Sequence, residues 1–161
     1  MEERAIIYLY TDGASSGNPG PGGYGAVLKY KGREKHLSGG FRLTTNNRME
    51  LLAVIAGLEA IKWDRADVHI YSDSAYVVNA INKGWLLNWE KKNFVKVKNP
   101  DLWKKFLILS RKHSLSFFWI KGHDGHPENE LCDELAVKAR TDGDDVELPA
   151  DVWYEEWMVN N

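Results

Sequence analysis

Residues 10–25 read YTDGASSGNPGPGGYG and place a carboxylate, Asp12, directly before a run of glycines and prolines. A phosphate-binding loop of the Walker type needs a Lys-Ser or Lys-Thr pair that leads into a helix, and a dinucleotide fingerprint also needs a following helix. Here no lysine occurs before Lys29, and residues 22–24 lead into a strand-like segment. The prolines also suit a turn. The stretch therefore predicts a hairpin connection after a strand that ends at Asp12.

The segments around this hairpin alternate between strand-like and helix-like patterns. Apolar, β-branched runs indicate strands, and helical periodicity preceded by Thr, Asn or Pro indicates helices. We expect strands at residues 5–12, 24–32, 33–41, 67–73 and 114–122, and helices at residues 44–63, 74–84, 99–113 and 126–140. This order predicts an α/β fold whose sheet carries an antiparallel hairpin at one edge.

Composition excludes several classes of protein. A chain of 161 residues with 43% hydrophobic and 27% charged residues is long enough for one domain with a real core. Its longest apolar runs are too short to span a bilayer, so we expect no membrane partner. The acidic N-terminus lacks the pattern of a signal peptide, and the single cysteine, Cys132, cannot form an internal disulfide. We therefore expect a cytoplasmic location.

Charge is unevenly distributed along the chain. Residues 141–161 contain seven acids and neither Lys nor Arg, so the rest of the chain sets 21 basic residues against 16 acids, a net charge of +5. Residues 83–113 contain nine Lys and Arg residues against only Glu90 and Asp101. For charge runs in general a solvated surface is the favoured interpretation, but a basic stretch beside an acidic tail is a polarity that calls for an explanation.

Four acids occupy positions that suit a shared site. Asp12 and Asp73 each end a predicted strand, and the carboxyl ends of parallel neighbours meet at one sheet edge. Glu50 lies on an otherwise apolar helix stripe, and Asp133 lies too far into the last helix to cap it. Each acid alone could be an ordinary turn or surface residue. Together they predict a metal site, and oxygen ligands favour Mg²⁺ or Mn²⁺ over zinc.

The motifs of the chain resemble those of bacterial type 1 ribonuclease H, the family that cuts the RNA strand of RNA–DNA hybrids. The matching motifs occur in order across residues 8–140. They are YTDGASSGNPGPGGYG, TTNNRMELLAVIAGLEAI, YSDSAYVVNAI, GW…NW, DLW and KGHDGHPENELCDELA. Their combination is specific, although any one of them alone would not be.

The resemblance implies both a fold and a chemistry. It implies a ribonuclease H-like fold, an α/β arrangement in which helices flank a five-stranded mixed sheet of order 3-2-1-4-5. Residues 1–140 would be the catalytic domain and residues 141–161 an acidic, aromatic tail. Two Mg²⁺ ions, for which Mn²⁺ can substitute, would be bound by Asp12, Glu50, Asp73 and Asp133. Hydrolysis would leave 5′-phosphate and 3′-hydroxyl ends. His123 matches the family histidine that assists proton transfer or product departure.

The resemblance also implies how the RNA–DNA hybrid is bound. The minor-groove, sugar and phosphate contacts would come from Ser15, Asn18, Thr45, Asn46 and Asn47. A basic protrusion would grip the DNA strand with Trp85, Trp89, Lys91, Lys92, Phe94, Lys96 and Lys98. This protrusion is shorter than its fullest family version, and Phe94 stands where Trp is common. We expect a monomer without a separate N-terminal hybrid-binding domain.

Two other functions stay open at this point. A two-metal nuclease of the same fold could act on DNA, as resolvases and integrases do, although the Asn46-Asn47 pair and the basic stretch favour a hybrid. A non-catalytic hybrid-binding module is the second alternative. It would be favoured if one of the four acids were missing.

Several residues allow a competing structural interpretation. A zinc site could be drawn from His123, His126, Cys132 and Asp133. Its irregular spacing makes this the weaker choice, and Cys132 is better explained as a small core residue. Tryptophans are expected to pack in the core at Trp63, Trp103 and Trp119.

The tail combines its acids with apolar side chains, which are Val152, Trp153, Trp157 and Met158. Disordered tails are normally poor in aromatic residues, so we expect residues 151–158 to dock their aromatic side against the body of the protein. Glu155 and Glu156 would point outward or lie near the basic stretch. Docking would either stabilise the fold or let the tail acids compete with nucleic acid for the lysines.

Overall fold

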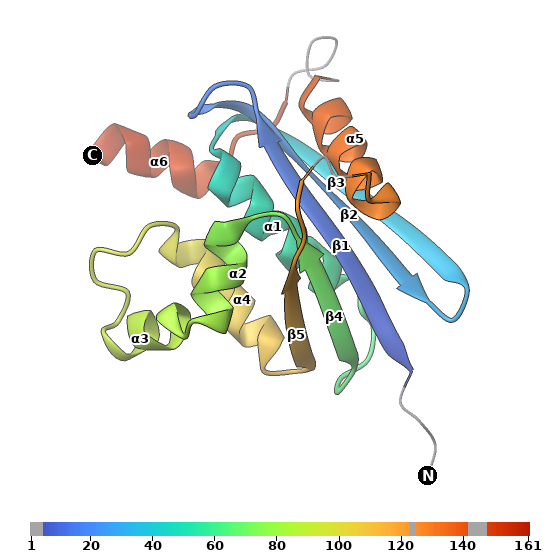
Figure 1. Cartoon of the computed structure of the whole chain (residues 1–161). Coiled ribbons are helices and arrows are strands. Elements are labelled where there is room, and N and C mark those ends of the chain that lie inside the picture. Colours follow the sequence, from blue (N-terminus) through green and yellow to red (C-terminus); the bar gives the residue numbers. More distant parts are fainter. Residues whose placement is uncertain (1–4, 123–124, 142–147) are drawn as a thin grey trace.

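The computed structural model describes residues 5–122, 125–141 and 148–161. These residues form a five-stranded sheet of order β3-β2-β1-β4-β5 (Figure 1), which confirms the expected order. The strands are β1 (Ile6–Ser15), β2 (Gly20–Tyr30), β3 (Arg33–Thr44), β4 (Asp67–Ser72) and β5 (Ser114–Trp119). β1, β2 and β3 pair antiparallel, whereas β4 runs parallel to both β1 and β5. The antiparallel hairpin at one edge is therefore as predicted.

Four of the helices were expected, and two were not. The helices are α1 (Asn46–Glu59), α2 (Ala75–Asn82), α3 (Trp85–Lys91), α4 (Pro100–Ser110), α5 (Pro127–Thr141) and α6 (Val152–Asn160). α3 begins directly after Gly84, where the prediction had a helix end and no new helix. α6 lies in the tail, for which no secondary structure was predicted.

The glycine-rich stretch is mostly paired strand, so the prediction that β1 ends at Asp12 and a loop follows is wrong. β1 continues to Ser15, and β2 already begins at Gly20. Close helix packing explains the glycines. A Cβ atom on Gly13 would lie 2.4 Å from the backbone nitrogen of Glu50 in α1, and one on Gly25 would lie 2.3 Å from the carbonyl oxygen of Cys132 in α5. Only glycine leaves room for such an approach.

α1 and α5 cover opposite faces of the sheet. Gly13 pairs with Tyr24, and the following residue, Gly25, points to the other face because side chains alternate along a strand. Figure 1 shows α5 in front of the strands and α1 behind them. The main core lies on the α1 side, where Trp103 and Phe106 of α4 are almost fully buried. This layering fixes the ends of β1 and α1 close together.

The three tryptophans that were expected in the core differ in how much of their side chain is exposed. Trp103 is fully buried, as predicted, and so is Cys132. Trp63 and Trp119 are 47% and 56% exposed, so the core prediction is wrong for both. Trp63 follows the end of α1, and its ring contacts that of Tyr30 near the surface. Trp119 closes the edge strand β5 and therefore lacks a neighbouring strand on one side.

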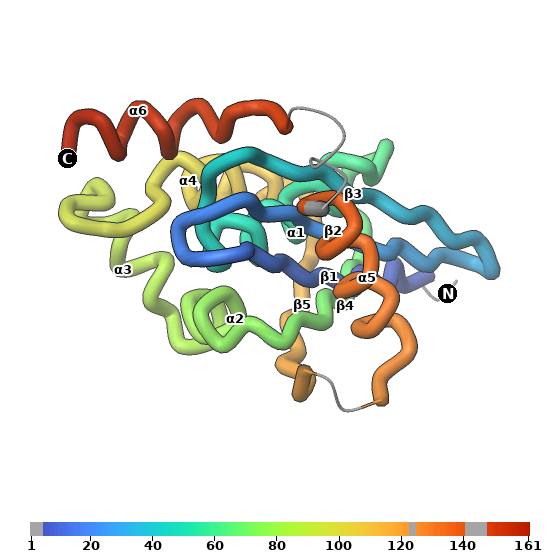
Figure 2. Tube along the Cα trace, turned by 90° about the horizontal axis from the view of Figure 1, so that it is seen from above, coloured from blue at the N-terminus to red at the C-terminus, as the bar shows by residue number. Residues whose placement is uncertain are grey.

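The tail docks as a helix. Tyr154 is 6% exposed, whereas Trp157 is 42% exposed, so the expected aromatic docking is only partial. In Figures 1 and 2 the C-terminal end of α6 lies on the side of the molecule that carries α3. Among the described residues, no helix has the length and apolar character that crossing a membrane requires.

Candidate active site

The site begins where β1 and β4 separate. Their parallel pairing ends at Thr11 and Ser72, and the next residues along the two strands are Asp12 and Asp73. The two acids therefore emerge at the same sheet edge, as the sequence predicts. Beyond this point β1 no longer pairs with β4 but still pairs with β2. Asp12 therefore lies on a backbone that is hydrogen-bonded on one side.

Glu50 reaches this edge from the first turns of α1. Thr45 caps the helix by accepting a hydrogen bond from the backbone N–H of Arg48 at 3.3 Å. The absence of a side chain on Gly13 brings the backbone of α1 against β1. Asp12, Glu50 and Asp73 then offer one oxygen each, and these oxygens all lie within 4.8 Å of one another.

The electrostatics of this group are unfavourable without a cation. Burial, followed by the charge of Asp73, raises the pKa of Asp12 to about 7. Burial and the charges of Asp12 and Asp73 raise the pKa of Glu50 well above its ordinary value. The Oε2 atom of Glu50 is buried and has no hydrogen-bond partner among the described residues. Carboxylates held this close together accommodate a divalent cation with oxygen ligands, such as Mg²⁺, Mn²⁺ or Ca²⁺.

Asp133 lies near this group without joining it. It is half-buried on α5, directly after Cys132, and its charge contributes to the raised pKa of Asp12. His123 lies outside the described residues. The zinc site considered from the sequence has no support among the described residues. Their one group of converging potential ligands is Asp12, Glu50 and Asp73, and this group contains neither His126 nor Cys132. Burial instead raises the pKa of the Cys132 thiol.

The residues expected at the minor groove lie around the start of α1 and the β1–β2 turn. The backbone N–H of Asn46 donates to the Oδ1 atom of Asn18 at 3.1 Å, so these two segments are tied together. Thr45 is occupied in part by its capping role, and Asn47 is exposed. Ser15 is the last residue of β1. The structure thus brings all five candidates to one end of the hairpin and of α1.

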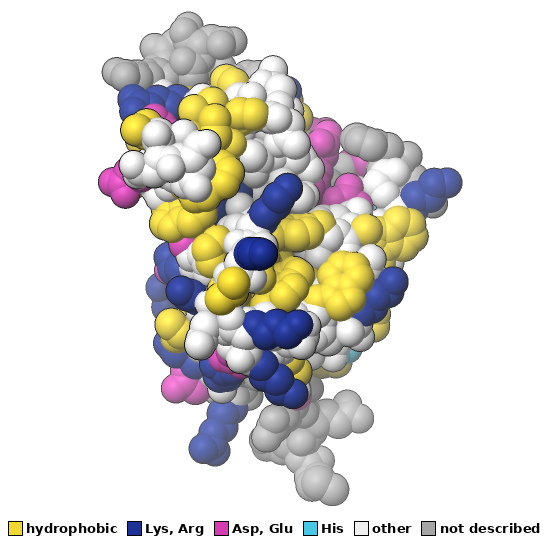
Figure 3. Space-filling model, turned by 90° about the vertical axis from the view of Figure 1, so that its left-hand side faces the viewer, with side chains coloured by type: hydrophobic (Ala, Val, Ile, Leu, Met, Phe, Trp, Pro, Cys, Tyr) yellow, Lys and Arg dark blue, Asp and Glu magenta, His cyan; other side chains and the backbone are white. Residues whose placement is uncertain are grey.

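The basic protrusion consists of α3 and the segment that follows it. Lys91, Lys92, Lys96 and Lys98 are all exposed. Its aromatic residues are divided: Trp85 is 41% exposed, whereas Trp89 and Phe94 pack partly against the core. On the face seen in Figure 3, basic side chains are interspersed with hydrophobic ones. This mixture suits a nucleic-acid backbone and its bases or sugars.

Two neighbours of Asp73 were not expected from the sequence. The indole N–H of Trp119 donates to the carbonyl oxygen of Asp73 at 3.2 Å. A Cβ atom on Gly122 would lie 2.7 Å from Oδ2 of Asp73. Trp119 thus contacts the backbone of Asp73, and the missing side chain of Gly122 leaves room for its carboxylate. In the sequence, only Gly122 had a signal, through its place in the KGHDGH motif.

The chain is similar to known proteins over most of its length. A family model described as RNase H matches residues 4–141. The chain belongs to the RNase H family. It is 56% identical over 151 residues to a Ribonuclease H from Desulforamulus reducens, and the alignment covers 91% of this chain and 92% of that one. It is 58% identical over 130 residues to the Ribonuclease HI of Helicobacter pylori, with 81% and 90% covered.

Solved RNase H structures share the fold. LC9-RNase H1, described as a type 1 RNase H with the type 2 active-site motif, superposes with a TM-score of 0.78 at 29% identity, over 88% of this chain and 74% of that one. LC11-RNase H1, solved in complex with an RNA/DNA hybrid, superposes with a TM-score of 0.63 at 29% identity, over 85% and 98% of the two chains. α6 lies beyond the residues that the family model matches.

Proposed function

We propose that this RNase H chain is an endonuclease that hydrolyses the RNA strand of RNA–DNA hybrids and leaves 5′-phosphate and 3′-hydroxyl ends. The observation that carries the proposal is the convergence of Asp12, Glu50 and Asp73 within 4.8 Å, in a chain of this family. The similarity to a family member solved with an RNA/DNA hybrid supports the choice of substrate.

The carboxylates hold the metal ions that the chemistry requires. In the proposal, Asp12, Glu50, Asp73 and Asp133 bind two Mg²⁺ ions, for which Mn²⁺ can substitute. When bound, the ions supply Lewis-acid chemistry: they acidify the attacking water and offset charge on the leaving 3′-oxygen. The unpartnered, buried Oε2 of Glu50 fits a ligand role, because such an atom is costly unless something cationic satisfies it. The nearby Asp133 supplies a more accessible oxygen.

The chain positions the hybrid from both sides of this group. Asn46 and Asn47 lie in the first turn of α1, where the helix dipole favours a negatively charged phosphate. Together with Ser15, Asn18 and Thr45 they are proposed to read the minor groove, and contacts to 2′-hydroxyl groups there would distinguish RNA from DNA. The basic protrusion is proposed to hold the DNA strand. His123 is proposed to assist proton transfer or product departure.

A cleavage assay on matched substrates tests this function. One sequence is prepared as an RNA–DNA hybrid, an RNA duplex and a DNA duplex, and each is incubated with the chain and Mg²⁺. We expect fragments from the RNA strand of the hybrid alone. Cleavage of the DNA duplex would favour a DNA nuclease, and tight binding to the hybrid without cleavage would favour a non-catalytic binding module.

The proposal extends to the domain organisation, oligomeric state and location of the protein. We propose that residues 1–140 act as the catalytic domain and residues 141–161 as a tail, in line with the family match to residues 4–141. We propose a monomer in the cytoplasm, where the single buried Cys132 would stay reduced. Sedimentation and fractionation experiments test these two statements directly.

A further inference from the structure

One buried arginine attaches α6 to the body of the protein. Arg48 of α1 is 2% exposed, and its Nε and Nη2 atoms donate to the Asp151 carboxylate at 2.8 and 3.0 Å. Thr44 donates to the same carboxylate at 2.7 Å. Asp151 also caps α6 by accepting from the backbone N–H of Tyr154 at 3.4 Å. The start of α6 is therefore fixed beside the start of α1.

A second ion pair, between Glu155 of α6 and an arginine of the sheet, also attaches the helix to the body of the protein. Glu155 accepts hydrogen bonds from the Nε and Nη2 atoms of Arg42 on β3, at 2.9 to 3.2 Å. Asp151 and Glu155 are thus both neutralised by arginines of the body. The lysines of the basic protrusion take no part in these contacts. The helix consequently does not present these two acids to the expected hybrid site.

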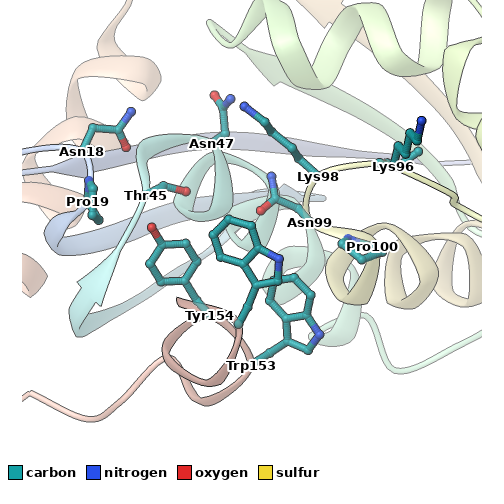
Figure 4. A pocket seen from close by; sticks show the side chains of 12 residues that line it. Asn18, Pro19, Thr45, Asn47, Lys96, Lys98, Asn99, Pro100, Trp153 and Tyr154 are labelled. Atoms are coloured by element: carbon teal, nitrogen blue, oxygen red, sulfur yellow. The ribbon is translucent and has the colours of Figure 1, made fainter. Parts of the chain in front are cut away.

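The aromatic residues of α6 line a pocket instead. The pocket has a volume of about 520 Å³, and Trp153, Tyr154 and Trp157 form its α6 side. Figure 4 shows Trp153 and Tyr154 rising from the helix, with Asn47 and Lys98 across the pocket. None of the described residues that line it is Asp or Glu.

The remaining lining comes from residues already expected to contact the hybrid. The start of α1 and the preceding hairpin contribute Asn18, Thr45 and Asn47, and the basic protrusion contributes Lys96 and Lys98. Neither lysine forms an ion pair with an acid in the part of the chain that the structure describes. The pocket therefore joins amide and hydroxyl groups, free positive charge and aromatic rings in one concave surface.

The rings are arranged as a continuous apolar wall. Trp157 stacks on Trp153 at a centroid distance of 6.3 Å and on Tyr154 at 5.9 Å. The guanidinium of Arg48 lies over the Trp153 ring at 4.9 Å, which fixes that ring from below. Trp157 is the most exposed member at 42%. An exposed indole held by stacking at a positively charged pocket suits contact with nucleic acid.

We propose that α6 extends the hybrid-binding surface, and that its aromatic wall packs against the sugar–phosphate backbone of the bound hybrid beyond the carboxylates. The lysines and amides of the pocket contact phosphates, while Trp157 and Trp153 cover the apolar faces of the sugars. This inference rests on the proposed function for its choice of ligand. In this proposal the tail does not compete with nucleic acid for the lysines. Instead, α6 contributes directly to binding of the hybrid.

Binding measurements on single substitutions test the inference. Truncating the tail is a poor test, because it would also leave buried Arg48 without Asp151. Trp157→Ala is better, because the side chain is substantially exposed. Its matched controls are Trp157→Phe, which keeps an aromatic face, and Trp63→Ala, which removes a similarly exposed indole that contacts Tyr30 instead. Each is combined with Asp12→Asn, and affinity for a labelled blunt-ended hybrid is measured by fluorescence anisotropy.

We expect Trp157→Ala to weaken binding roughly five- to tenfold, near the low end of the loss caused by removing one aromatic stacking contact to a base, because a sugar offers a smaller apolar face than a base does. Trp157→Phe should restore most of the affinity, Trp63→Ala should leave it unchanged, and the melting temperature of Trp157→Ala should stay near that of its parent. Unchanged affinity in Trp157→Ala would overturn the proposal. The same titration is repeated with a hybrid that carries single-stranded overhangs. A loss seen only with the overhangs would also overturn the proposal, because it would assign the aromatic wall to a single strand. The cleavage assay tests the proposed function separately: if that function is wrong, the wild-type chain does not cut the hybrid.

Discussion

Asp12 is buried close to Asp73 and Glu50, an arrangement that could hold a metal ion and that raises the pKa of the Asp12 carboxyl to about 7. Replacing it with Asn removes one proposed metal ligand and one buried carboxyl group. We predict that Asp12→Asn leaves no detectable hydrolysis, a larger loss than the roughly 10²–10⁴-fold that removing a general acid–base group causes, because the substitution disrupts the proposed metal pair. Binding to the hybrid should persist, because its contacts come from other residues. Steady-state kinetics and anisotropy on the same preparation measure both, and turnover near the wild-type level would contradict the ligand assignment.

The same substitution has an expected effect on folding. Burial and the charge of Asp73 raise the pKa of Asp12 to about 7, so ionised Asp12 opposes folding at pH 8 when no metal is bound. Asn keeps the shape without the charge. In EDTA at pH 8 we therefore predict a higher melting temperature for Asp12→Asn than for the wild type. About 2–4 °C is the scale expected for each kcal/mol gained. A lower melting temperature would show that Asp12 is stabilised by contacts rather than strained.

His123 should matter less than the carboxylates. If it transfers a proton, His123→Ala should slow kcat by roughly 10²–10⁴-fold at most and leave metal affinity unchanged. Titration of Mg²⁺ against rate separates the two parameters. An increased Mg²⁺ requirement accompanied by complete loss of activity would make His123 a ligand instead.

At the residue scale, the prediction from sequence succeeds where a side chain has a chemical signature. Asp12 and Asp73 stand out because each follows an apolar strand, and Glu50 because it interrupts an apolar stripe. Trp63 and Trp119 were misplaced because hydrophobicity alone does not say whether a neighbouring element exists to cover the ring. The role of Arg48 could not be predicted either, since its partners Asp101 and Asp151 come from distant parts of the chain.

Among the helices, Arg48 connects α1 with the starts of α4 and α6. It forms ion pairs with Asp101 and Asp151 at 2.8 Å, and its side chain is 2% exposed. Arg48→Ala would leave two carboxylates unpaired, one of them buried. We predict a loss of roughly 3–5 kcal/mol in the free energy of unfolding, measured by urea denaturation.

Arg42→Ala is the matched control for this experiment. Arg42 also reaches α6, through Glu155, but its side chain is 52% exposed. Exposed pairs typically contribute about 0–1 kcal/mol, so the control should unfold near the wild-type midpoint. Equal losses in the two variants would show that the burial of Arg48 is not what makes it important.

The basic protrusion makes a separate prediction at the scale of elements. Replacing Lys91, Lys92, Lys96 and Lys98 with Ala should raise KM for the hybrid and flatten its dependence on salt. Each lost phosphate contact removes about one unit from the slope of log affinity against log salt. A control with the same change in charge replaces four exposed lysines elsewhere, which are Lys35, Lys62, Lys105 and Lys112. If both variants have the same slope, the protrusion does not touch the phosphates.

Elements with a long periodic pattern were predicted well, and short ones were not. α3 spans only Trp85–Lys91 and follows Gly84, which read as a helix end. The extent of β1 was misjudged because glycines usually indicate turns. In this hairpin they mark places where α1 and α5 approach the sheet, and such packing depends on parts of the chain far away in sequence.

At the scale of the whole molecule, the strand order of the sheet determines where the carboxylate group lies. The order 3-2-1-4-5 makes β1 and β4 parallel neighbours, and this brings Asp12 beside Asp73 although 60 residues separate them. That order follows from the family motifs and not from periodicity alone. The position of α6 beside the start of α1 could not be predicted, because the tail carries no motif and its attachment depends on Arg48.

The central claim is that the carboxylate group works through bound divalent cations. Its most direct test is cleavage of a labelled RNA–DNA hybrid with Mg²⁺, with Mn²⁺ and in EDTA, followed by analysis of the fragment ends. We predict fragments with 5′-phosphate and 3′-hydroxyl ends in the presence of either cation, and no cleavage in EDTA until cation is restored, because attack on phosphorus requires a metal-activated water. Full activity in EDTA, or 2′,3′-cyclic phosphate ends, would contradict the account.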